Sequence, residues 1–487
     1  MKLYKKDGNM IQIISFPNEN IEKGDYLLIE DSFPVKALIA QVIDVQFASI
    51  PGVLEELLRT LPEDAELFQG EDIDPLEIAP HTMYIQDASL LICKIRATFK
   101  NKLLSPSTSW LPSRSKSVIK KLPIPELLKI AKVDGTRPIT LGVTKDSSLL
   151  TIDASSLDGR LNIITGKKGC GKSHMSKLLM SSLIDFRATV VIFDLNGEYS
   201  SLGLSTNGEK NKYYNKIHEL IPSKNFRVSL NQLHLNVIMG IMIHALKLPG
   251  ASSREFRRIW KMLRDRNQLT LYDLGEAIRN LNCNQHVRDA LSSRYHALVN
   301  SGFFTNEESE SNFLSECMIR SKENGGAIVI NLRNTSTIDR QIIVEFVLGK
   351  LVDLLTCWKL KAVFLFAEEA HLYLRETYWE DIVTRMRHFG IFTTFITNQP
   401  DTIQESIYRQ ADNIFLFNFT NEHDLDVVSR AARVDAQTVR AIAVDLPIQH
   451  CLTMGKVVED FPIVAKVKAL DIQTKGETRL FFKKINS

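Results

Sequence analysis

Residues 161–184 read LNIITGKKGCGKSHMSKLLMSSLI, and this stretch decides the fold class. The segment LNIIT predicts a buried strand, and HMSKLLMSSLI predicts a helix. Between them lies G-x-x-x-x-G-K-S, the spacing of a phosphate-binding P-loop. Glycines let successive backbone N–H groups turn toward phosphate, and the helix N-terminus adds a favourable dipole. The predicted nucleotide-binding residues are Gly166, Lys167, Lys168, Gly169, Cys170, Gly171, Lys172, Ser173 and His174.

Two side chains of this loop carry the predicted chemistry. Lys172 is expected to bridge the β and γ phosphates of ATP, and the Ser173 hydroxyl is expected to ligate Mg²⁺. The positions between the glycines hold Lys167, Lys168 and Cys170. The two lysines add positive charge for phosphate, and Cys170 is expected to make the loop sensitive to oxidation.

A second strand ends in a pair of acids, in VFLFAEEAH at residues 363–371. Ligands of open α/β sheets collect at the carboxyl edge, so these acids should share an edge with the P-loop. We expect Glu368 to hold magnesium through water. Glu369 should orient and deprotonate the water that attacks the γ-phosphate.

Two further predicted strands are followed by polar residues. The segment TTFITNQP ends with Gln399, which is suited to hydrogen-bond the γ-phosphate or the attacking water. The segment FDLNGEY carries Asp194 and Glu198, which either lie near the nucleotide or couple it to a neighbouring subunit.

The rest of the chain fits an α/β ATPase core preceded by a smaller module. Helical stretches alternate with nearly continuous apolar strands, the pattern of a mainly parallel sheet covered on both faces. These strands are predicted at 161–165, 190–194, 327–332, 362–367, 393–397 and 414–419. The expected organisation is a β-rich, barrel-like domain at 1–100, a basic Ser/Pro-rich linker at 101–130, an ATPase domain at 131–470 with a helical insertion at about 213–324, and a tail at 471–487.

Composition narrows the class of protein. The 487 residues carry a formal net charge of +3, so a nucleic-acid partner would need a local basic surface. The six cysteines are scattered without a metal-binding spacing, which fits a reducing compartment. No apolar stretch approaches the roughly 20 residues of a membrane helix. We therefore expect a cytoplasmic protein that is not inserted in a membrane.

The four motifs GKKGCGKS, DLNGEY, EEAH and TNQP occur in this order, and together they resemble the HerA branch of the HerA/FtsK ATPases. The resemblance implies a RecA-like ATPase core and a homo-oligomer, a hexamer, with ATP between subunits and duplex DNA in a central channel. It also implies a companion nuclease or effector protein, in DNA end processing or antiviral defence. The N-terminal segment with GDYLLIEDS is similar to the small barrel of this family.

The same resemblance implies an arginine that acts on the ATP of a neighbouring subunit. In this family it follows E-E-A-H within a basic motif before F-G, which here is TRMRHFG at 384–390. Arg387 is the first choice for this role and Arg385 the second. Arg160, just before the P-loop strand, also matches a basic position of the family. The segment N-Q-P replaces the family's Q-R-P, so one basic residue is missing beside Gln399.

Residues 252–267, SSREFRRIWKMLRDRN, predict an amphipathic helix with an outward basic face. Such a face would contact backbone phosphates without reading sequence; the alternatives are an acidic partner or plain solvation. Two functions remain open at this point. One is ATP-driven translocation along DNA, and the other is an ATP-dependent platform that assembles partner effector subunits. A membrane-anchored DNA-transfer ATPase is disfavoured because no membrane segment is predicted.

Overall fold

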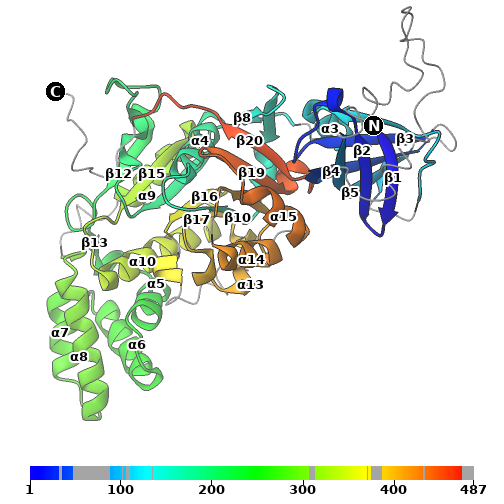
Figure 1. The fold of residues 1–487 in the computed structure, drawn as a ribbon. Coiled ribbons are helices and arrows are strands. Elements are labelled where there is room, and N and C mark those ends of the chain that lie inside the picture. Colours follow the sequence, from blue (N-terminus) through cyan, green and yellow to red (C-terminus); the bar gives the residue numbers. More distant parts are fainter. Residues whose placement is uncertain are drawn as a thin grey trace, which may run out of the picture.

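The structure is a computed structural model, which describes residues 1–31, 36–47, 88–100, 103–105, 110–133, 135–306, 313–369, 371–374, 387–419, 421–431 and 434–473. An N-terminal antiparallel sheet lies at one end of a larger α/β domain, and a helical lobe extends from the other side of that domain (Figure 1).

In the part of the chain that the structure describes, the N-terminal sheet is a half-barrel, so the barrel expected from the sequence is not confirmed. Its order is β1 (Lys2–Asp7), β2 (Met10–Ser15), β5 (Ser89–Lys100), β4 (Lys36–Phe47), β3 (Tyr26–Asp31) and β7 (Val118–Leu122), with β6 (Leu103–Ser105) paired to β5. The register between β4 and β5 shifts twice, and such irregularities bend and twist a sheet. The end strands β1 and β7 approach each other but do not pair in the described residues.

Part of the segment predicted as a linker is folded. Strand β7 pairs antiparallel with β3, and helix α3 (Ile124–Ile130) follows it directly. Two lysines of β7 form ion pairs with acids on or next to the neighbouring strand β3. Lys120 pairs with Glu30 at 3.0 Å, and Lys121 pairs with Asp25 at 2.7 Å. These lysines therefore have acidic partners within the half-barrel.

The half-barrel is docked on the α/β domain through buried polar contacts. The Tyr26 hydroxyl and the Gln41 amide both donate to the Pro462 carbonyl at 2.9 Å. Arg96 donates to the Asp435 carboxylate at 2.8 Å. Because these groups are removed from water, the pairings fix how the half-barrel sits on the ATPase domain.

The α/β domain is built on a mixed sheet, where the sequence predicted a mainly parallel one. Seven strands are parallel in the order β12 (Ile217–Leu220), β15 (Gly326–Asn331), β11 (Thr189–Asp194), β16 (Val363–Glu368), β17 (Ile391–Thr397), β10 (Asn162–Thr165) and β18 (Asn413–Leu416). Four antiparallel strands continue it: β19 (His450–Gly455), β20 (Ile463–Val467), β8 (Pro138–Thr144) and β9 (Leu149–Asp153). The six predicted strands all exist. The antiparallel extension was missed because its strands lie at both ends of the domain sequence, outside the alternation of strands and helices.

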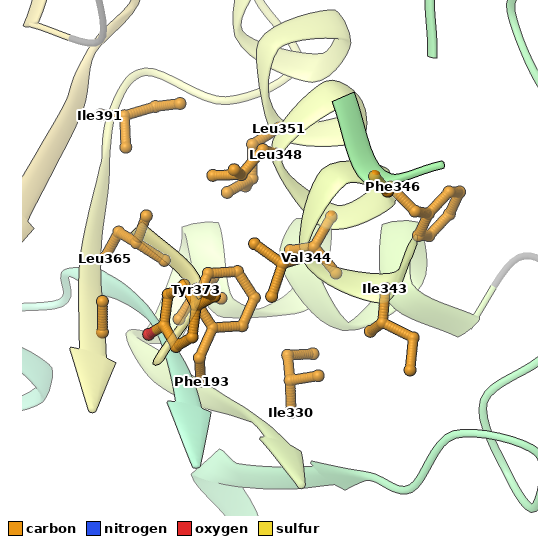
Figure 2. Close-up of a cluster of buried hydrophobic side chains, with 14 of the residues drawn as sticks. Phe193, Ile330, Ile343, Val344, Phe346, Leu348, Leu351, Leu365, Tyr373 and Ile391 are labelled. Carbon is orange, nitrogen blue, oxygen red and sulfur yellow. The ribbon is translucent and has the colours of Figure 1, made fainter. Parts of the chain in front are cut away.

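Helices cover both faces of this sheet, which explains why its strands are apolar throughout. Along β11, Val190 and Ile192 pack with α4 (Lys172–Asp185), whereas Val191 and Phe193 belong to the core on the other face. Figure 2 shows that second face, where side chains of α10 (Thr337–Thr356) pack on the strands. The P-loop helix is thus held against the sheet by a core of its own.

The region predicted as a helical insertion also contributes strands. Its strand β12 joins the edge of the main sheet, and β13 (Val228–Ser229) pairs with β14 (Phe304–Thr305). The lobe itself consists of α5 (Leu235–Gly240), a π-helical turn at Ile241–Ala245, α6 (Gly250–Asp265), α7 (Leu271–Arg279) and α8 (Gln285–Asn300). After it, α9 (Phe313–Asn324) leads into β15.

The remaining short helices follow the acidic pair and β17. They are α11 (His371–Leu374), α13 (Glu405–Tyr408), α14 (Glu422–Ala431) and α15 (Ala436–Ala443). Among the described residues, none of the helices has the length and apolar character needed to cross a membrane.

One core acid gives a testable stability effect. Glu345 on α10 is 5% exposed, its Oε1 atom has no hydrogen-bond partner, and burial raises its pKa to about 8. Between an unfolded-state pKa near 4.5 and the folded value, only the folded chain keeps the proton. Stability therefore falls as pH rises through this window and levels off above it.

We expect Glu345→Gln, which keeps the shape without a titrating proton, to be about 1–3 kcal/mol more stable than the wild type at pH 9. The difference should shrink toward pH 5. Thermal midpoints of both proteins from pH 5 to pH 9 measure this, and a pH-independent difference would contradict the assignment.

Candidate active site

The P-loop joins β10 to α4, and its glycines are required by its geometry. Gly166, Gly169 and Gly171 have φ values of 152°, 79° and 120°, where a side chain is strained. A Cβ on Gly166 would also lie 2.5 Å from the Cβ atom of Phe417. The loop is braced from the end of β18, because the Lys167 backbone N–H donates to the Asn418 carbonyl at 3.0 Å.

Lys172 is the first residue of α4, and its side chain folds back onto this loop. Its ammonium group donates to the carbonyls of Gly166 at 2.7 Å and Lys167 at 2.9 Å. Burial lowers the pKa of Lys172, and nearby acidic groups, Glu369, Glu198 and Glu368 among them, oppose this shift. The loop and the acids of DLNGEY and EEAH therefore meet in one site, as expected from strands that end at the same edge.

Glu369 follows β16 and has a backbone φ of 48°, a conformation that costs energy for a residue other than glycine. Its half-buried carboxylate accepts a hydrogen bond from the Asn398 backbone N–H. Burial raises the pKa of Glu369, and the positive charge of Lys172 opposes this. Glu369 therefore lies close enough to the P-loop lysine for their charges to interact.

Glu368 points toward β11. Its carboxylate accepts hydrogen bonds from the Leu195 N–H at 3.0 Å, the Asn196 N–H at 3.2 Å and the Asn196 side-chain amide at 3.1 Å. The Tyr373 hydroxyl donates to the Glu368 carbonyl at 3.1 Å. Burial, followed by the charges of Asp194 and Glu198, raises the pKa of Glu368 well above its ordinary value. Glu368 therefore ties the end of β16 to the turn after β11.

The turn after β11 brings a further acid to the P-loop. The buried Asp194 carboxylate accepts hydrogen bonds from the N–H groups of Gly197, Glu198 and Tyr199 at 2.7 to 3.0 Å, which closes the turn. Glu198 then receives a hydrogen bond from the Ser173 hydroxyl. Burial raises the pKa of Glu198, and this hydrogen bond opposes the shift.

Sequence reasoning left the place of Glu198 open, and the structure puts it on the P-loop serine. The predicted metal ligands Ser173 and Glu368 have different partners: Ser173 contacts Glu198, and Glu368 contacts Asn196. The signal for Glu198 was the D-x-x-G-E spacing, in which Gly197, at φ 73°, lets the turn close.

The arrangement of acids fits a magnesium ion. No group of three or more metal-binding side chains that could hold an ion alone occurs in the part of the chain described. This is the usual situation for Mg²⁺ in phosphate-transfer sites, because phosphate and water complete its oxygen shell. After burial as the main cause, Asp194 raises the pKa values of Glu198 and Glu368, and Glu198 also raises that of Glu368. A divalent cation next to Ser173 would relieve that repulsion.

The other predicted site residues lie around this centre. Gln399 is exposed at the end of β17, next to the P-loop strand β10. The His174 ring is hydrogen-bonded to the Lys468 carbonyl at 2.8 Å, so it ties α4 to the end of β20. Lys167 and Lys168 are exposed.

Cys170 is 2% exposed, and burial raises its pKa. Both effects disfavour the reactive thiolate, so the expected sensitivity of the loop to oxidation is not supported.

The predicted arginines lie at the amino ends of the parallel strands, whereas the P-loop and the acids lie at the carboxyl ends. Arg160 precedes β10, and Arg387 precedes β17. Both contact Asp412, which precedes β18: Arg160 at 3.5 Å and Arg387 at 3.1 Å. Asp412 is 4% exposed on its side chain, and it also accepts a hydrogen bond from the Leu161 N–H at 3.0 Å. Arg385 lies outside the described residues.

This position excludes contact with the P-loop of the same chain. Six residues of extended chain from Arg160 to Gly166 span about 20 Å, well beyond the reach of an arginine side chain. The Arg160 side chain is 40% exposed and the Arg387 side chain is 32% exposed, and Arg387 also donates to the Gln410 carbonyl at 2.7 Å. The exposed part of each guanidinium side chain can contact another molecule.

A P-loop at the carboxyl edge of a sheet of this order, with an acidic strand end two strands away, defines a RecA-like P-loop ATPase fold. Residues 139–351 match the family model described as the central domain of the helicase HerA. The resemblance inferred from the four motifs is thereby confirmed. A curated relative, the probable helicase MJ1565 of Methanocaldococcus jannaschii, is 24% identical over 381 residues, which cover 72% of this chain and 71% of the relative.

Solved structures agree on the fold. VirB4 of Thermoanaerobacter pseudethanolicus is similar with a TM-score of 0.52 at 14% identity, over 69% of this chain and 98% of that chain. The plasmid coupling protein TrwB, in complex with a non-hydrolysable ATP analogue, is similar with a TM-score of 0.51 at 13% identity, over 74% of this chain and 95% of that chain.

Proposed function

We propose that this chain is an ATP-driven translocase on duplex DNA that works as a closed ring, a hexamer, with each ATP bound between two subunits. The observation that carries the proposal is the separation of its two charged centres. The acids and the P-loop lie at one edge of the sheet, and Arg387 with Arg160 lies at the other. A complete site then needs the arginine edge of a second copy.

Such a contact is head to tail, because two different edges of the molecule meet. Repeated head-to-tail contacts produce a ring when the rotation closes. ATP in the interface would let each hydrolysis event move one subunit relative to the next, which is what translocation requires. The HerA central-domain match and the ATP-analogue complex of TrwB support the proposal.

The residues then have separate tasks. Backbone N–H groups of the loop and Lys172 bind the β and γ phosphates. Ser173 and Glu198, with Glu368 behind them, would hold Mg²⁺, which neutralises charge on the phosphates. Glu369 orients the water and accepts its proton, because its raised pKa makes it a better base than an exposed glutamate. Gln399 hydrogen-bonds the γ-phosphate or the water. Arg387 stabilises charge from the next subunit.

The test is duplex stimulation of ATP hydrolysis, combined with displacement of a protein block from linear DNA. We expect both in the wild type. Lys172→Ala should abolish nucleotide binding and both activities, measured with a fluorescent ATP analogue. Lys224→Ala, at an exposed lysine of the ATPase domain, is the matched control and should behave as the wild type.

The same test separates the alternative of an ATP-dependent assembly platform. A platform would hydrolyse ATP without duplex stimulation and leave the block in place, and that result would refute translocation. A companion nuclease and a role in end processing or antiviral defence are implied by the resemblance alone and stay predictions. The cytoplasmic location also stays a prediction.

A further inference from the structure

One helix of the lobe has a net positive charge as large as that of the whole chain. Helix α6 and the following Arg266 carry six basic side chains against two acidic ones, a net of +4, whereas the whole chain carries +3. The rest of the protein is therefore close to neutral. The basic side chains are Arg254, Arg257, Arg258, Lys261, Arg264 and Arg266.

Because the apolar side of α6 is buried, the basic side chains of this helix face the solvent. Phe256, Ile259, Trp260 and Leu263 are at most 4% exposed and belong to the main core. All six basic residues are exposed. The helix therefore cannot turn its basic face inward without removing its apolar stripe from the core.

Most of these cations have no acidic partner. Arg258 pairs with Glu255 at 3.4 Å, and Arg264 donates to the Leu233 carbonyl at 3.2 Å. Arg254, Arg257 and Lys261 have no ion pair or side-chain hydrogen bond within the described residues, and they follow one another at helical spacing along one face. Surface cations that serve only solubility are usually interspersed with acids.

The spacing of these three fits a nucleic-acid backbone. Seven residues of helix from Arg254 to Lys261 rise about 10 Å. One strand of duplex DNA has a phosphate for about every 3.4 Å along its axis and winds around that axis, so a straight row of this length can face at least two phosphates. A flexible acidic protein segment would match the charge but not require a straight row.

From this geometry we infer that α6 is a second duplex-DNA contact, made by Arg254, Arg257 and Lys261 with backbone phosphates. It lies on the lobe formed by α6, α7 and α8, on the side of the ATPase domain away from the half-barrel (Figure 1). The contact would hold DNA at one face of the ring while the ATP sites move it. This inference rests on the proposed function, because it assumes that duplex DNA is the substrate.

The experiment compares the full-length wild type, the triple variant Arg254→Gln/Arg257→Gln/Lys261→Gln, and a control with the same charge change, Lys129→Gln/Lys224→Gln/Lys359→Gln. The control lysines are exposed and lie in three separate parts of the fold. The readout is the affinity for a short duplex of random sequence as a function of salt. The assembly mass and thermal midpoint of each protein are measured alongside.

We expect the α6 variant to bind duplex about a hundredfold more weakly at 0.1 M salt and to lower the slope of log affinity against log salt by about 2 to 3. The control should keep the wild-type slope. If the wild type binds duplex and the α6 variant keeps its affinity and slope, the inference is wrong and the translocase proposal stands.

Three other results overturn the inference in distinguishable ways. If the wild type does not bind duplex at all, the proposed function fails with it. If the α6 variant loses its ring assembly, the basic face binds a neighbouring subunit. If it loses binding to polyglutamate while keeping duplex affinity, the face serves an acidic protein.

Discussion

Glu369→Gln is expected to keep ATP binding and to slow hydrolysis by about two to four powers of ten, the usual contribution of a general base. The amide has nearly the shape of the carboxylate and can still accept from the Asn398 N–H. It cannot accept a proton from water. The measurement is ATP turnover by phosphate release, together with the affinity for a fluorescent ATP analogue.

Glu323→Gln, at an exposed glutamate of α9, is the matched control and should hydrolyse ATP as the wild type does. If Glu369→Gln hydrolysed ATP at close to the native rate, Glu369 would not be the base. The proton would then have to pass to another acid of the site, and Glu198 is the first candidate because it contacts the P-loop serine.

Arg387→Ala should leave ATP binding and ring mass unchanged and slow hydrolysis by about three to five powers of ten, the effect of losing an arginine finger. The reason is geometric, since Arg387 precedes β17 at the sheet edge opposite to its own P-loop and is proposed to act in the next site. Arg409→Ala removes an exposed arginine that directly follows α13 and pairs with Glu405, and it should have little effect.

Mixing provides the sharper test. Glu369→Gln subunits still present Arg387, and Arg387→Ala subunits still present Glu369. A ring with both variants therefore contains some complete sites, and mixing two inactive preparations should restore hydrolysis. Mixed rings that form but stay inactive would mean that Arg387 acts within its own chain or only supports the fold.

Asp412→Asn gives a separate view of the same element. The buried carboxylate holds Arg160 and Arg387 together, and the neutral amide removes both ion pairs while keeping the shape. If Asp412 positions the arginines, this variant should lower the rate of hydrolysis without changing ATP affinity, and mixing with Glu369→Gln should rescue it. A fall in thermal stability without a lower hydrolysis rate at unchanged ATP affinity would indicate a structural role.

The order of the sheet explains which parts of the site the sequence could predict. The P-loop, the acidic pair, Gln399 and Asp194 each lie at or just after the carboxyl end of an apolar strand, and parallel strands align these ends. Their meeting at one edge follows from local patterns alone. The partners of Ser173 and Glu368 did not follow, because they depend on how tightly the turn after β11 closes around Asp194.

By itself, the sequence determined the phosphate loop with its strand and helix, the six central strands and the amphipathic basic helix. Each is a property of neighbouring residues, set by glycine spacing and apolar periodicity. Only the tertiary structure decided the strand order of the N-terminal half-barrel, that four antiparallel strands extend the central sheet, and that Arg160 and Arg387 share Asp412. These depend on pairings between residues far apart in the chain, which burial and backbone hydrogen bonding select only when the whole sheet assembles.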